Sequence, residues 1–340
     1  MSEIHVSLLV IPEADLSSLT GLHTVLNLYK NVVPDTVSFV AELVVPESVL
    51  EASDNVADFV QSKVGLPIPV QRKMEDIEHT DVLIIPSLFT DPEGEWHTGN
   101  HPDIINWMKD LYENEILLCS SCTGALLLAE TGLLDNQEAT QHWAFERTFR
   151  RNFPKVKLNT AKILVTTGEG DRIVMSGASA AWHDLVLYII ARYAGPAAAR
   201  SIAKFFLLHW HSDSQAPYIV FHENTQHDDT SILIAQNWLR ENSNAQNPVE
   251  NVLQQSGLPA RSFTRRFRKA TGFTPINYVQ HLRVEAAKQH LEMTAVSVDE
   301  ISFKVGYEDP AFFRRVFKRI TSLTPSAYRR KFCVIGNSPD

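Results

Sequence analysis

The chain has few of the features that stabilise secreted proteins or anchor proteins in membranes. Its 340 residues include three cysteines, too few for the disulfide framework of a small extracellular domain. The start lacks the basic region and long apolar core of a signal peptide. Apolar runs such as Leu185–Ala191 are far too short to span a bilayer. We therefore expect a cytoplasmic protein with no membrane partner.

Metal-binding patterns are also scarce. Cys119 and Cys122 form a Cys-x-x-Cys pair, but no second cysteine pair accompanies it, as a zinc site would need. We interpret Cys119 as a small buried strand residue, because a redox pair needs a thioredoxin-like context. The histidines between residues 209 and 227 fit no strong metal template. The sequence predicts neither a metal nor a cofactor.

The formal charge divides sharply along the chain. Residues 230–340 hold 16 Lys and Arg against 9 Asp and Glu, whereas residues 1–229 hold 15 against 31. The overall charge of −9 argues against a nucleic-acid partner, but a basic C-terminal part beside an acidic one favours it. We expect the basic part to dock on phosphate and the acidic part to avoid it.

Three sequence blocks in the last hundred residues occur twice, in one order and with about fifty residues between copies. The block at 247–250 recurs at 297–300, the block at 263–267 recurs at 313–317, and the block at 273–278 recurs at 323–328. A repeat of this size indicates a supersecondary unit used twice.

Each copy predicts a helix, a tight turn and a second helix. Asn247 with Glu250, and Ser297 with Glu300, have the spacing of capping boxes. The first helices should end near residues 256 and 304, each before a glycine able to adopt a left-handed turn. Second helices are expected at 260–270 and 310–320, and a helix of about 25 Å over 276–292 joins the copies.

The second helix of each copy carries an apolar stripe and a basic face. Phe263 and Phe267 lie four residues apart, as do Phe313 and Phe317, so each pair should be buried. This arrangement is typical of helix-turn-helix DNA-binding proteins. The residues expected to face outward are Arg261, Thr264, Arg265 and Arg268 in the first copy and Ala311, Arg314, Arg315 and Lys318 in the second.

Residues 230–333 resemble the DNA-binding domain of the AraC family of transcription regulators. The resemblance is most specific over Gly306–Lys318 and Thr324–Arg329. It implies two recognition helices in the major groove of double-stranded DNA. One departure is Pro259, where the family often has a serine that caps the first recognition helix. By position the resemblance assigns base contacts to Arg261, Thr264 and Arg265 and to Ala311, Arg314 and Arg315.

The front two-thirds alternate between strand and helix patterns. Strands are expected at 5–11, 37–45, 81–86 and 115–120, and helices at 16–30, 104–112 and 123–131. This alternation predicts an α/β domain with a mostly parallel sheet and helices on both faces. The all-α domain with two helix-turn-helix motifs follows it. Ligands of such sheets bind beyond the carboxyl ends of the strands.

At the end of the fourth expected strand, Cys122 stands at a turn into a helix. This geometry can expose a thiol at a helix N-terminus, where the helix dipole favours the thiolate. The runs 122–125, 132–134 and 139–143 make residues 1 to about 210 resemble the PfpI-type domain, which has the flavodoxin-like class I glutamine amidotransferase-like fold. Joined to an AraC-like domain, it resembles the GlxA-type regulators. We place this domain at 1–211, a polar linker at 212–229 and a tail at 334–340.

In enzymes of that superfamily, a cysteine at the position of Cys122 is the nucleophile, a histidine near His142 can assist it, and an acidic residue often contacts it. Ser18 stands where that aspartate or glutamate usually lies. Without the carboxylate the machinery that tunes the thiol is incomplete. We therefore expect no catalysis, and Cys122 and His142 would be vestigial. The residues expected to line a ligand pocket are Cys122, Thr123, His142, Trp143 and Ser18.

The most consistent function is a transcription regulator that binds specific DNA and is controlled by a small molecule. The resemblance implies a homodimer and favours an activator, which would have RNA polymerase as a partner. Trp143 could bind a cationic nitrogen compound, and resemblance favours an amine or amino-acid-like effector. Two alternatives remain open: a cysteine hydrolase or glyoxalase-like enzyme using Cys122, and an architectural DNA-binding protein without a ligand.

Overall fold

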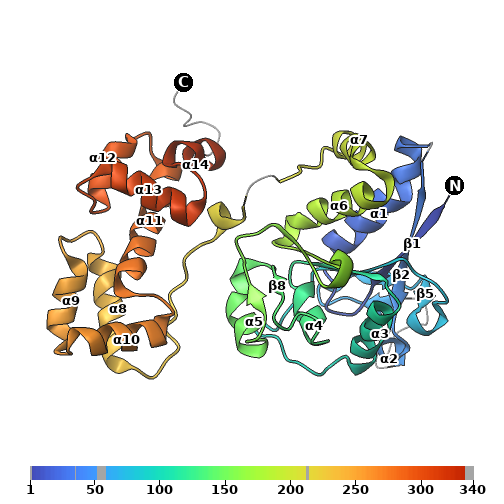
Figure 1. Cartoon of the computed structure of the whole chain (residues 1–340), viewed down its shortest axis with the longest axis horizontal. Coiled ribbons are helices and arrows are strands. Elements are labelled where there is room, and N and C mark those ends of the chain that lie inside the picture. Colours follow the sequence, from blue (N-terminus) through green and yellow to red (C-terminus); the bar gives the residue numbers. More distant parts are fainter. Residues whose placement is uncertain (1, 35, 52–58, 212–213, 334–340) are drawn as a thin grey trace. The chain divides into compact units, whose positions relative to one another are not determined.

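The computed structural model describes residues 2–34, 36–51, 59–211 and 214–333. The chain forms two compact units, Met1–Gln215 and Ala216–Asp340 (Figure 1). The division falls within the stretch predicted as a linker. Within the predicted linker, Phe221 packs against the core of the second unit. The predicted tail and residues 212–213 lie outside the described part. Within the described ranges, no helix combines the length and apolarity needed to cross a membrane.

The first unit is built on a seven-stranded sheet in the order β10-β11-β7-β6-β1-β2-β5, parallel except for the antiparallel pair β10–β11. Its central strands are apolar on both faces: every residue of β6 is buried, as a parallel sheet between two helical layers requires. The strands are β1 (Glu3–Leu9), β2 (Ser38–Val45), β5 (Arg72–Lys73), β6 (Val82–Ile85), β7 (Leu117–Ser121), β10 (Leu164–Thr167) and β11 (Ile173–Ser176). Two short pairs lie apart from it: β3 (Phe59–Gln61) with β4 (Pro67–Pro69), and β8 (Glu138–Ala139) with β9 (Lys157–Leu158).

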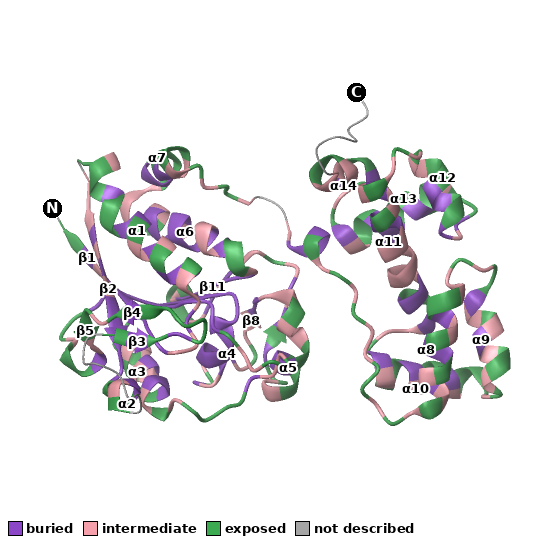
Figure 2. Ribbon diagram, turned by 180° about the vertical axis from the view of Figure 1, so that it is seen from behind, coloured by how far each residue is buried: buried purple, intermediate pink, exposed green. Residues whose placement is uncertain are grey.

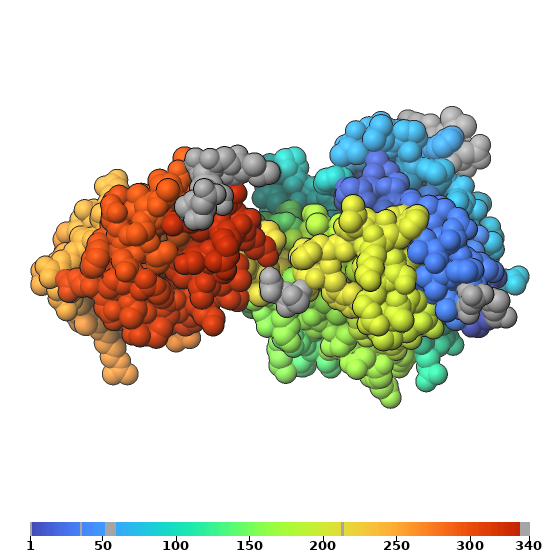
Figure 3. Space-filling model, turned by 90° about the horizontal axis from the view of Figure 1, so that it is seen from above, coloured from blue at the N-terminus to red at the C-terminus, as the bar shows by residue number. Residues whose placement is uncertain are grey.

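Helices cover both faces of this sheet (Figure 1). On one face lie α1 (Leu16–Val32), α6 (Trp182–Ala194) and α7 (Pro196–Phe206), and α1 and α7 run side by side although far apart in sequence (Figure 3). On the other lie α3 (Pro102–Glu113) and α4 (Gly124–Ala129), with the shorter α2 (Glu47–Glu51) and α5 (Glu146–Asn152). Buried residues concentrate in the strands and in α4 (Figure 2). The predicted α/β fold is confirmed.

The second unit is all helical and holds two hydrophobic cores. Tyr278 and Val279 belong to the core of the first repeat, whereas Val284, Ala287 and Leu291 belong to that of the second. All five lie on one helix, α11, which therefore joins the repeats rigidly. The helices are α8 (Thr230–Asn242), α9 (Pro248–Ser256), α10 (Ala260–Thr271), α11 (Pro275–Met293), α12 (Val298–Lys304), α13 (Pro310–Thr321) and α14 (Pro325–Phe332).

The two repeats reproduce each other in atomic detail. Tyr278 packs edge-on against Phe267 with ring centroids 5.1 Å apart, and Tyr328 packs against Phe317 at 5.5 Å. The hydroxyl of Thr274 accepts the N–H of the residue at N3 of α11, and that of Thr324 does the same for α14. Both motifs therefore have one internal frame, as the sequence repeat predicted.

The helix starts at 247 and 297 differ. The Ser297 hydroxyl accepts the Glu300 N–H at 3.2 Å, which is one half of the predicted capping box. The capping box predicted at Asn247 is wrong, because this residue adopts a left-handed conformation (φ 49°) and its side chain caps nothing. Pro248 begins α9 without that cap. The start of α9 is therefore set by the loop before it.

Gly306 and Gly257 occupy equivalent turns, and both have positive φ, 92° and 62°. Only Gly306 is crowded, because a Cβ there would lie 2.6 Å from the Asn244 carbonyl oxygen, whereas one on Gly257 meets nothing within 4 Å. We expect Gly306→Ala to destabilise the second unit by about 1–3 kcal/mol more than Gly257→Ala. Thermal unfolding followed by helical circular dichroism measures the difference. Equal losses would show that the Asn244 backbone yields freely.

Candidate nucleic-acid interface and thiol site

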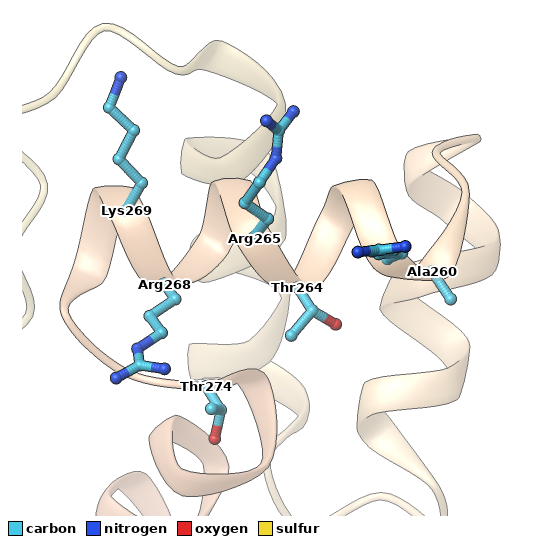
Figure 4. Close-up of a pocket in the computed structure, with 7 residues that line it drawn as sticks. Ala260, Thr264, Arg265, Arg268, Lys269 and Thr274 are labelled. Carbon is cyan, nitrogen blue, oxygen red and sulfur yellow. The ribbon is translucent and has the colours of Figure 1, made fainter.

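The first candidate recognition helix, α10, separates an apolar face from a basic one. Phe263 and Phe267 are 1% and 0% exposed, and the face opposite is polar and solvent-accessible. That face borders an open groove of about 760 Å³ (Figure 4). In Figure 4, Arg265 and Lys269 extend from one side of the helix and Arg268 extends toward Thr274. The groove is lined by Ala260, Arg261, Thr264, Arg265, Arg268, Lys269 and Thr274.

One arginine of α10 is not part of this face. Arg266 makes a two-pronged ion pair with Asp229, with N–O distances of 2.8 and 2.6 Å. The hydrogen bond from Arg266 lowers the pKa of Asp229. Asp229 also caps α8 through the Ile232 N–H. Arg266 therefore fastens α10 to α8. The repeat carries a signal for this, because the equivalent residue of the second copy is the apolar Val316.

The second candidate recognition helix, α13, begins at a true cap. The Asp309 carboxylate accepts the Ala311 N–H at 2.8 Å, and Pro310 supplies the first helical residue. Phe313 and Phe317 are fully buried. The predicted outward residues are all exposed: Ala311, Arg314, Arg315 and Lys318.

The arginines of α13 are held by neighbours of the same motif. Arg314 forms an ion pair with Asp299 of α12. The guanidinium of Arg315 lies 5.6 Å from the centre of the Phe312 ring and 3.9 Å from the Asp309 carboxylate. Exposed pairs of this kind contribute little stability. Phosphates or base edges can therefore replace the carboxylates at small cost.

The thiol site lies where β7 ends. Cys122 has a positive φ of 55°, and its N–H donates to the Ser176 carbonyl at 2.9 Å. A Cβ on Gly124 would lie 2.4 Å from the Pro86 carbonyl oxygen, so only glycine lets α4 start this close to β6. The turn is therefore sharply defined, as the small residues around it predicted.

The turn could expose a thiol at a helix N-terminus, but the structure buries it. Cys122 is 2% exposed, and burial raises the pKa of its thiol. Its sulfur contacts hydroxyls, the Ser179 Oγ at 3.6 Å and the Thr123 Oγ1 at 3.8 Å. The helix that follows has only six residues and its dipole does not outweigh desolvation.

The other candidates of this site are neutral and hydrogen-bonded. Ser18 is fully buried, and its hydroxyl accepts the Ser87 N–H at 3.2 Å. The Thr123 hydroxyl accepts the Leu88 N–H at 2.8 Å. Ser18 and Thr123 therefore hold residues 87 and 88 through neutral hydroxyls.

His142 and Trp143 are the remaining candidates, and both are partly exposed. The His142 Nδ1 accepts the Ala144 N–H at 3.1 Å, and its ring lies 5.3 Å from that of Trp143. Burial lowers the pKa of His142, which favours the neutral form of its ring. Among the described residues, no hydrogen bond joins His142 to Cys122. Nor does the described part of the chain gather three or more His, Cys, Asp or Glu side chains in a geometry suited to a metal ion.

Comparison with known proteins agrees with both halves of this geometry. Residues 252–331 match the model of a helix-turn-helix domain, and residues 34–176 match that of the DJ-1/PfpI family. The regulator CdhR of Pseudomonas aeruginosa is 27% identical, over 78% of this chain and 76% of its own. The regulator GlxA of Rhizobium meliloti is 26% identical, over 62% and 64%. The MmsAB operon regulatory protein of P. aeruginosa is 35% identical over 28% of this chain and 31% of its own.

The fold, the paired basic helices and these matches define the protein as a helix-turn-helix transcription regulator. It is similar to GlxA-type regulators of the AraC family, because it joins a match to the DJ-1/PfpI family to a match to a helix-turn-helix domain. Because relatives of the DJ-1/PfpI fold include enzymes, the state of the Cys122 thiol deserves a direct test.

We expect Cys122 to react slowly with iodoacetamide at neutral pH, because its raised pKa leaves little thiolate. The rate should keep rising with pH beyond the ordinary thiol pKa of about 8.5. Peptide mass spectrometry resolves Cys122 from Cys333, which is partly exposed and serves as the internal reference. A rate plateau below pH 7 would reveal an activated thiolate and contradict this reading.

Proposed function

We propose that this regulator activates transcription in the cytoplasm, as a homodimer that contacts RNA polymerase and responds to a small molecule at the thiol site. One observation carries the DNA-binding part: α10 and α13 each bury two phenylalanines and present the opposite, basic face to solvent. Two such faces joined by one continuous helix suit two reading heads on one duplex.

The α10 face would engage one major groove and the α13 face the next. Arginine side chains read guanine edges by paired hydrogen bonds, while Lys and further Arg contacts neutralise phosphate. The α11 helix has nineteen residues and is therefore about 28 Å long, close to one turn of DNA at about 34 Å. The proposed contact residues are Arg261, Thr264, Arg265, Arg268, Ala311, Arg314, Arg315 and Lys318.

A sensing role for the thiol site, and not a catalytic one, is supported by its neutral surroundings. Ser18, Thr123 and Cys122 offer hydroxyls and a protonated thiol, which recognise a polar group without activating it. Trp143 and His142 are partly exposed, and an aromatic ring attracts a cationic nitrogen compound. The proposed effector is an amine or amino-acid-like molecule. It regulates only if it favours one arrangement of the DNA-binding units.

Dimerisation is supported by apolar side chains left in solvent on the first unit. Phe205 and Leu207, at the end of α7, are 64% and 90% exposed. Apolar surface of this kind commonly marks a protein–protein contact. Analytical ultracentrifugation of Phe205→Ser beside the unchanged protein tests whether this end of α7 holds two copies together.

The DNA-binding proposal is tested by selecting bound sequences from random DNA with the purified full chain. Two conserved elements about one helical turn apart would support paired reading heads. An inverted or direct repeat of that pair would then report the symmetry of the dimer. Selection of a single short element would mean that only one helix reads sequence.

The effector proposal is tested by thermal unfolding with a panel of amines, amino acids and short acids. A ligand at a hundred times its Kd stabilises the protein by about 2.7 kcal/mol. Trp143→Ala should lose the shift if its ring forms part of the site. An active panel member that stabilises Trp143→Ala equally would bind elsewhere, and an inactive panel would favour an architectural protein without a ligand.

We expect Arg315→Ala to weaken binding to the selected DNA by about 1–3 kcal/mol and to relax preference at one base position. Lys318→Ala is the matched control one turn along α13, and it should weaken all sequences alike and reduce the salt dependence. Titrations against the selected duplex and its single-base variants distinguish the two. A uniform loss in Arg315→Ala would show a contact to phosphate only.

A further inference from the structure

The side chain of Gln215 is a buried polar junction at the end of the first unit. It is the last residue of that unit, and Ala216 begins the second. The side chain is 3% exposed. Its Oε1 accepts the Ala178 N–H at 2.7 Å, and its Nε2 donates to the Lys162 carbonyl at 2.7 Å and the Gln141 carbonyl at 3.3 Å. Three separate segments of the first unit therefore meet at one amide.

Two of these segments belong to the thiol site. Residues 176–179 contact Cys122 at both ends: the Ser176 carbonyl accepts the Cys122 N–H at 2.9 Å, and the Ser179 hydroxyl lies 3.6 Å from the Cys122 sulfur. Gln141 directly precedes His142 in the chain. Gln215 thus bonds to the loop that touches the thiol and to the residue that precedes His142.

The fit around Gln215 leaves little room for motion. A Cβ on Gly177 would lie 2.0 Å from the Gln215 Nε2, so only glycine admits the amide here. The Gln215 N–H also donates to the Ala161 carbonyl at 2.8 Å. A buried amide whose hydrogen bonds are satisfied resists displacement, because each broken bond leaves a polar group unpaired in the interior.

We propose that Gln215 is the positioning residue that couples the thiol site to the DNA-binding unit, an inference that rests on the proposed function. An occupant that presses on Ser179 moves residues 176–179. Because these residues are bonded to Gln215, the movement must break the amide contacts or shift the chain where the second unit begins. Coupling is reciprocal, so DNA binding must then favour one state of the thiol site.

The coupling is measured without knowing the effector by filling the site genetically. Cys122→Met places two further heavy atoms beside Ser179 and so imitates an occupant. The Kd of the full chain for its selected duplex is measured in the original protein, Cys122→Met, Gln215→Met and the double variant. The matched control is Ser214→Ala, which removes a 2.6 Å bond to the Ala161 carbonyl but leaves the Gln215 amide intact.

We expect Cys122→Met to change the Kd about fivefold or more, the lower end of typical coupling, in the original protein and in Ser214→Ala. The same change should vanish in Gln215→Met. If Gln215 had a merely structural role, Cys122→Met would instead change the Kd by the same factor in every background. An equal effect of Cys122→Met with and without Gln215 overturns the proposal, and so does the absence of any effect in the original protein.

Gly177→Ala provides a second route if Gln215→Met fails to fold, because the added methyl group displaces the amide from the opposite side. In the Gly177→Ala background, as in Gln215→Met, Cys122→Met should no longer change the Kd for DNA. A change of the same size as in the original protein would contradict the proposal. Failure of the original protein to select any DNA would instead refute the proposed function. The two failures are therefore distinguishable.

Discussion

The DNA-binding half depends on the burial of phenylalanines spaced four residues apart. Phe263 and Phe267 fix the rotation of α10 about its axis, and Phe313 and Phe317 fix that of α13. Because a helix has 3.6 residues per turn, burying one stripe of residues exposes the residues on the opposite face to solvent. The basic faces are thus consequences of apolar packing, and their geometry is as rigid as the cores beneath them.

The two candidate sites differ in charge and in burial. In the second unit the cations on the basic faces of α10 and α13 are exposed to solvent, where phosphate can reach them. In the first unit the hydroxyls that contact the Cys122 sulfur are uncharged, and Cys122 itself is buried. A buried neutral site can discriminate ligands by hydrogen bonds, since a mismatched partner leaves a polar group unpaired.

The elements that the sequence predicted are those governed by local rules. The bounds of α10, α12 and α13 and the end of α9 followed from apolar spacing, from the Ser297 cap and from glycines that tolerate positive φ. The features it missed depend on partners far along the chain. Arg266 lies 37 residues from Asp229, and Gln215 lies 37, 53 and 74 residues from the groups that its amide bonds. No periodicity encodes such pairs.

Local rules also failed where the surroundings overrode them. A helix N-terminus favours a thiolate in general, but six residues of α4 provide a weak dipole, and complete burial of Cys122 opposes any charge. Asn247 has the side chain of a capping residue, yet the chain enters α9 in a left-handed conformation that directs that side chain elsewhere. In both cases the residue type allows a conformation or a charge, and the packing of the neighbouring segments determines whether the residue adopts it. Ser18 is fully buried, and its uncharged hydroxyl accepts the Ser87 N–H, so this side chain adds a hydrogen bond beside the turn without adding a charge.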